Sequence, residues 1–82
     1  MPTIHYEKGY RFYFNSNENK EPPHVHIKGE KGRMKVWLLA LNIANCRGIP
    51  DHTQTRLLEI VETNQKKFLR EWKEFKQREV EK

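Results

Sequence analysis

This chain of 82 residues has a single cysteine and no long apolar run, and each shortage excludes a class of protein. Cys46 alone cannot form a disulfide within the chain or build a cysteine-based zinc site, which suits a reducing compartment. The longest apolar run, residues 36–41, is too short to cross a bilayer. The first residues lack the basic start and apolar stretch of a signal peptide. We therefore expect a cytoplasmic protein without a membrane segment.

Length and charge narrow the class further. A chain of this size corresponds to one domain, residues 1–82, whose core is thin enough that a second copy in a homodimer is one way to complete it. The formal net charge is +5, and residues 1–50 hold eight Lys or Arg against four acids. A positive field of this kind favours polyanions, of which nucleic acid is the commonest.

The N-terminal half predicts a sheet. Aromatic and β-branched residues fall between turn signals in four segments, which we expect to be strands of a mainly antiparallel sheet over residues 1–39. These segments are residues 3–7, 10–15, 24–28 and 33–39. Residues 40–50 form a connector whose composition leaves open a short strand or one helical turn.

From Asp51 the apolar spacing changes to that of a helix, which we expect to run from 51 to 78 with Asp51 as its N-cap and Gln54 completing a capping box. Asn64 interrupts the apolar stripe, and we expect it to bond a backbone group of the loop around residues 40–48. The predicted fold is therefore α+β, a four-stranded sheet with one long C-terminal helix packed on one face.

Alternation along the strands divides the predicted sheet into two faces. The face expected under the helix is apolar: Phe12, Phe14, Val25, Ile27, Met34, Val36 and Leu38. The opposite face collects cations, histidines and rings: Arg11, Tyr13, His24, His26, Lys28, Arg33, Lys35 and Trp37. His5 joins this second face if the first strand pairs in the matching register. Cations interleaved with rings suit single-stranded nucleic acid, because cations meet phosphates and rings stack on bases.

The segment Pro22-Pro23-His24-Val25-His26-Ile27 places two imidazoles on one face of a strand. Such a pair can bind a metal, move protons or meet phosphates. Zinc needs three or four ligands, and the nearby His5, Glu18, Glu21 and His52 lie at no diagnostic spacing, so we predict no metal site and no cofactor.

Three functions remain open from these residues. The first is a module that binds RNA or another polyanion through Arg11, Tyr13, Lys28, Arg33, Lys35 and Trp37. The second is a metal-independent endoribonuclease in which His24 and His26 act as the acid–base pair and a cation stabilises the phosphorane. The third is a regulatory module that binds a protein partner and no nucleic acid.

Several segments together resemble a known family. The opening Met1-Pro2-Thr3-Ile4, the aromatic strand after Gly9, the Pro-Pro-His-Val-His-Ile segment and the spacing Asn64…Leu69…Trp72 resemble the small bacterial proteins catalogued as domain of unknown function 4160. The resemblance implies a cytosolic bacterial protein in a toxin–antitoxin-like gene arrangement, with a small cognate protein partner and RNA as target. It implies no catalytic residues. Many relatives carry a further histidine shortly before the Pro-Pro pair, where this chain has Asn19-Lys20-Glu21.

Overall fold

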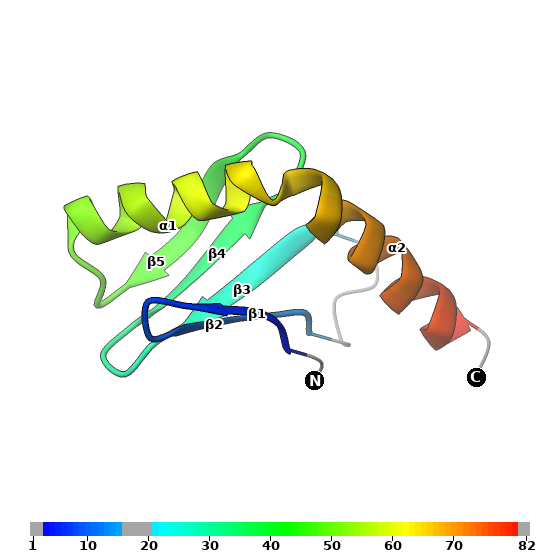
Figure 1. Cartoon of the computed structure of the whole chain (residues 1–82), viewed down its shortest axis with the longest axis horizontal. Coiled ribbons are helices and arrows are strands. Elements are labelled where there is room, and N and C mark those ends of the chain that lie inside the picture. The colour runs from blue at the N-terminus through cyan, green and yellow to red at the C-terminus, as the bar shows by residue number, and fades with distance from the viewer. Residues whose placement is uncertain (1–2, 16–20, 81–82) are drawn as a thin grey trace.

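The computed structural model describes residues 3–15 and 21–80, with side chains up to residue 77. Five strands form one antiparallel sheet in the order of the chain, and two helices follow (Figure 1). The elements are β1 (Thr3–Glu7), β2 (Tyr10–Tyr13), β3 (His24–Lys28), β4 (Arg33–Trp37), β5 (Asn42–Arg47), α1 (Asp51–Thr63) and α2 (Gln65–Val80).

The predicted α+β class is confirmed, but the predicted number of strands was wrong. The sheet has a fifth strand, β5, inside the segment that we treated as a connector. This strand is hard to recognise because it lies at an edge, most of its residues are exposed, and Ala44 bulges out between Ile43 and Asn45. Strands β2 and β4 are also shorter than predicted, ending at Tyr13 and Trp37.

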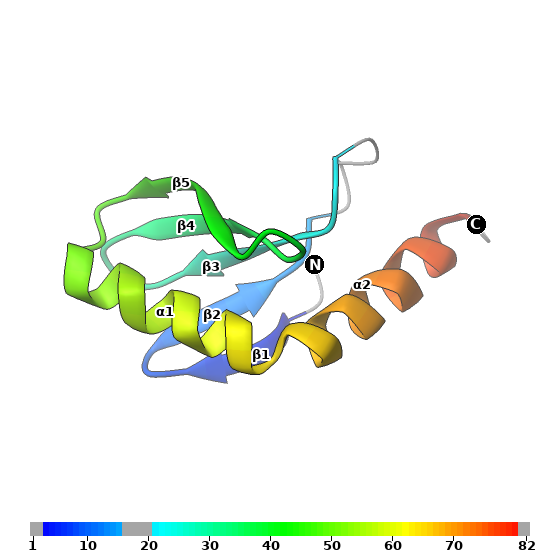
Figure 2. The same cartoon turned by 90° about the horizontal axis from the view of Figure 1, so that it is seen from above.

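The apolar face of the sheet is buried as the alternation predicts. All seven residues that we predict on the apolar face are at most 3% exposed. Helices α1 and α2 contribute Leu57, Ile60, Val61, Phe68 and Trp72 to the same core. Figures 1 and 2 show α1 lying across one face of the sheet and α2 running past the ends of the strands.

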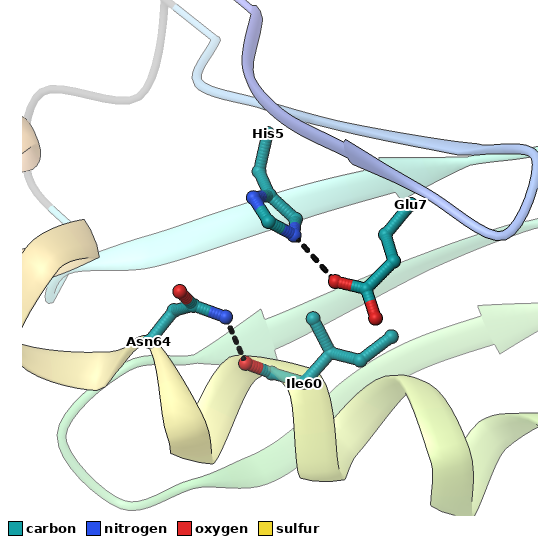
Figure 3. A network of polar contacts seen from close by, with 4 residues as sticks. All are labelled: His5, Glu7, Ile60 and Asn64. Carbon is teal, nitrogen blue, oxygen red and sulfur yellow. Dashed lines mark hydrogen bonds and ion pairs between the residues drawn. The ribbon is translucent and has the colours of Figure 1, made fainter.

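The prediction of a single long helix was also wrong. The chain forms two helices, separated at Asn64. The Asn64 side chain donates through Nδ2 to the carbonyl oxygen of Ile60 at 2.8 Å (Figure 3), an oxygen that also accepts from the Asn64 backbone N–H. A side chain that bonds the carbonyl four residues back bends or interrupts a helix. The break is invisible in the apolar spacing because helical bonding resumes at once, from the Phe68 N–H to the Asn64 carbonyl.

The bond to the neighbouring loop comes from Gln65 and not from Asn64. Gln65 Nε2 donates to the Leu38 carbonyl oxygen at 2.7 Å and so ties α2 to the turn after β4. The start of α1 also differs from the prediction, which had Asp51 as the N-cap and Gln54 in a capping box. Pro50 is the N-cap residue, and Gln54 Nε2 donates to the Ile49 carbonyl at 2.8 Å.

Neither helix in the described part of the chain combines the length and the apolar character that a membrane span requires.

Gly48 lets the end of β5 approach the turn between β3 and β4. Its φ of +76° lies in the left-handed region, and a Cβ at this position would clash with the backbone carbonyl oxygen of Lys31. Gly9, in the two-residue turn between β1 and β2, has a similar φ of +81° but open space around the position of a Cβ. The two glycines therefore share a backbone conformation and differ in steric surroundings.

This difference gives a matched pair of variants. Gly9→Ala should lose about 1–2 kcal/mol of unfolding free energy, the cost of a left-handed L-residue. Gly48→Ala should lose at least about 1 kcal/mol more, because the added methyl overlaps the Lys31 carbonyl. Urea unfolding followed by tryptophan fluorescence measures both losses. Equal losses would show that the close contact between β5 and the turn at residues 29–32 is not formed.

Candidate functional site

The sheet face opposite the helices, here called the open face, carries a row of four cations. Arg11 on β2 pairs with Lys28 on β3, Lys28 pairs with Arg33 on β4, and Arg33 pairs with Arg47 on β5. We call these four residues the cation row. With neighbouring strands about 4.8 Å apart, the row crosses about 14 Å of the sheet. None of the four faces a carboxylate in the register of the described strands.

A second row lies beside the first on the same face. Tyr13, His26, Lys35 and Asn45 pair in turn across β2 to β5, two residues along each strand from the cation row. The Tyr13 and His26 rings are stacked, with centroids 5.4 Å apart and planes 22° apart. Two residues of strand separate the rows by about 7 Å. The open face therefore sets a line of positive charge parallel to a line of rings and polar groups.

The cations of the open face also contact its rings. The Arg11 guanidinium lies 4.8 Å from the centroid of the Tyr13 ring, and Lys35 Nζ lies 4.7 Å from that of Trp37. Lys35 Nζ also makes an ion pair with Glu21, a residue just before β3. The sequence predicted no acid on this face, and the Glu21–Lys35 ion pair shows that this prediction was wrong. Because Glu21 partly neutralises Lys35, the cation row carries most of the positive charge of the open face.

A cavity of about 470 Å³ opens on this face and takes its lining from β2 to β5. Arg33 and Arg47 from the cation row line it, together with Tyr13, His26, Lys35 and Asn45 from the second row. Asn15, Ile27 and Met34 complete the lining. The volume lies in the range of pockets that hold small ligands.

The two histidines of the Pro-Pro-His-Val-His segment have different surroundings. His24 is fully buried, and its ring contacts those of Trp37, His26 and, at 4.9 Å, Trp72 on α2. Its Nδ1 donates to the Pro22 carbonyl oxygen at 2.9 Å. Since a carbonyl oxygen only accepts, Nδ1 carries the proton, and the ring is fixed in one orientation. His26 is half-buried and lines the cavity.

His5 lies on the helix side of the sheet and not on the open face. Its Nε2 contacts Glu7 Oε1 at 2.7 Å, close to the Asn64 bend (Figure 3), and its ring packs against Phe12 and Phe68. The regular pairing from the turn, Glu7 with Tyr10 and then His5 with Phe12, puts His5 on the same face as the core residue Phe12. Over residues 3–15 and 21–77, no three His, Cys, Asp or Glu side chains gather as metal ligands. The earlier candidate Glu18 lies outside the described residues.

The predicted open-face residues on β2, β3 and β4 come together, and His24 contacts His26 and Trp37 among them but is buried against Trp72 of α2. Sequence reasoning missed further residues of this face, among them Tyr6, Asn42, Asn45 and Arg47. Tyr6 pairs with Arg11 and is 69% exposed, so it extends the cation row with a ring. Asn45 and Arg47 lie on the unrecognised strand β5. The bulge at Ala44 puts Ile43 and Cys46 three residues apart, so β5 lacks the period-of-two alternation that identified the other strands.

Comparison with known proteins gives one match. The profile of the family described as Domain of unknown function (DUF4160) matches residues 9–73. No curated protein and no solved structure matches the chain. The matched region includes the cation row, the cavity and both histidines.

The different surroundings of the two histidines predict different costs of removal. His24→Ala should lower the unfolding free energy by about 2–4 kcal/mol, because it leaves a cavity between Trp37 and Trp72. His26→Ala should cost about 1 kcal/mol or less, since its ring is partly exposed and its removal leaves no closed cavity in the core. Urea unfolding of both variants measures this difference. If both cost the same, His24 does not anchor α2 to the sheet.

Proposed function

Because the chain belongs to the DUF4160 family, whose description assigns no activity, we propose a function from the open face itself. The protein binds RNA as a polyanion, and it does so across the strands through the cation row. The resemblance also predicts a toxin–antitoxin-type component with a small protein partner, and that role stays a prediction.

The cation row is the observation that carries this proposal. Like charges directly opposite each other on neighbouring strands destabilise a sheet by about 0.2–1 kcal/mol per pair. Arg11, Lys28, Arg33 and Arg47 make three such pairs in succession. A polyanion laid along the row would relieve this repulsion and release its own counterions, and both effects favour binding.

The rings beside the cations favour a single strand over a duplex. Unpaired bases stack on aromatic side chains, and a sheet face with Tyr13, His26 and the exposed Tyr6 offers such rings next to the phosphate-binding cations. Duplex RNA hides its bases in a deep groove that side chains cannot read.

The burial of His24 favours binding over cleavage. An acid–base pair must reach the attacking and leaving oxygens of its substrate. His26 lines the cavity, whereas His24 is covered by Trp37 and Trp72 and bonded to the Pro22 carbonyl. Cleavage by this pair would require α2 to leave the sheet, so the proposed function does not include it.

The salt dependence of RNA binding tests the proposal. In fluorescence-anisotropy titrations with single-stranded RNA, the logarithm of the association constant should fall with the logarithm of salt concentration at a slope of about −2 to −3, as expected for three or four phosphate contacts. Arg47→Gln should weaken binding and flatten this slope by about 0.7. Arg56→Gln, an exposed cation on α1 across the sheet from the cation row, is the matched control and should change neither.

Each sample is then run on a denaturing gel. Intact RNA agrees with a binding module, whereas cleavage lost in His26→Ala would replace it with the endoribonuclease. No binding at low salt, or equal effects of Arg47→Gln and Arg56→Gln, would overturn the proposal and leave the protein-partner module.

A substitution of Glu21 should strengthen RNA binding, whereas the substitution of Arg47 weakens it. Glu21 neutralises Lys35 in the second row, so Glu21→Gln should raise RNA affinity about two- to fivefold, the equivalent of one exposed ion pair. The same titrations measure the change, with Glu30→Gln in the turn after β3 as the control that alters net charge equally. An equal gain in both variants would mean that total charge, and not the Glu21–Lys35 pair, sets affinity.

A further inference from the structure

We propose that the cavity on the open face is a subsite for one unpaired adenine base of the bound RNA. The inference rests on the proposed function and adds base selectivity to it. Two observations support the adenine subsite. Residues of both rows line this cavity, and two side-chain amides, those of Asn15 and Asn45, lie in the lining.

The cavity combines a phosphate site with a base site. Arg33 and Arg47 pair directly across β4 and β5, so their side chains lie next to each other at one end of the lining. The second row lies about 7 Å away, a separation that one ribose can bridge between a phosphate and its base. A nucleotide whose phosphate contacts the two arginines therefore extends its base over the second row.

The walls of the base site differ in chemistry. The stacked Tyr13 and His26 rings form an aromatic wall, which any base can contact through its π face. The opposite wall is Asn45, and Asn15 lines the same cavity. The rings provide affinity without selectivity, so selection between bases depends on the amides.

The side-chain amide presents a donor and an acceptor side by side, a pattern that complements the Hoogsteen edge of adenine. Asparagine pairs in this way with the N6 amino group and N7 of adenine, whereas guanine is read mainly by Arg or Lys at O6 and N7. The nearest lysine, Lys35, is held by Glu21 and lies over the Trp37 ring. The two arginines are at the phosphate end. Asn45 is thus the group placed to read the base.

Asn42 provides a matched control for Asn45. Both asparagines are exposed residues of β5, and Asn42 pairs with Trp37 on the open face just as Asn45 pairs with Lys35. Asn42 does not line the cavity. Each substitution therefore removes one side-chain amide from β5, and only the substitution of Asn45 removes it from the cavity.

The test measures anisotropy with short oligouridylate probes that carry one adenosine, guanosine or cytidine at the centre, or none. The wild-type protein should bind the adenosine probe about tenfold tighter than plain oligouridylate, the discrimination expected of one bidentate contact. Asn45→Ala should reduce that preference to less than about twofold. Asn42→Ala should keep the full preference.

The outcomes separate the subsite from the proposed function. Salt-dependent binding of every probe with equal affinity would overturn the adenine subsite and leave RNA binding intact. A preference for guanosine that is lost in Arg47→Gln would also overturn it, since an arginine would then read the base. If no probe binds in a salt-dependent way, the proposed function fails and the subsite fails with it.

Discussion

Burial of one face of the sheet under the two helices is the constraint on which the rest of this structure depends. Because side chains alternate between faces, a slip of one residue in any strand would move Phe12, Ile27, Met34 or their neighbours into solvent. The apolar face therefore fixes which side of the sheet each residue of β2, β3 and β4 occupies, and it puts Arg11, Lys28 and Arg33 on the open face. The pairing of the strands then aligns these three cations in one row.

This dependence explains why much of the fold and of the site could be predicted from the sequence. Alternation identified the buried positions of three strands and, by the same spacing, most of the open face. It could not identify β5, because an exposed edge strand with a bulge at Ala44 has little apolar pattern to detect. Arg47 and Asn45, which complete the two rows, were missed for that reason.

Other differences arise where one hydrogen bond outweighs a periodic pattern. The Asn64 side chain ends α1 by bonding the Ile60 carbonyl, although the apolar stripe continues through it. His24 has the alternation of an open-face residue but lies buried, because α2 extends past the strands and brings Trp72 against its ring. Neither the bend nor the reach of α2 is encoded in local spacing, since both depend on tertiary contacts.

The spacing of His24 and His26 suggests one shared role, but the two side chains have different roles in the structure. His24 is the first residue of β3 and connects the sheet to α2. Its ring bonds the Pro22 carbonyl and packs between Trp37 and Trp72. His26, two residues later, stacks on Tyr13 at the wall of the cavity. A rigid Pro-Pro segment before β3 serves both, because fixing His24 in the core also fixes the position of His26 on the open face. The sharpest sequence motif of this chain thus joins the part that holds the fold to the part proposed to bind RNA.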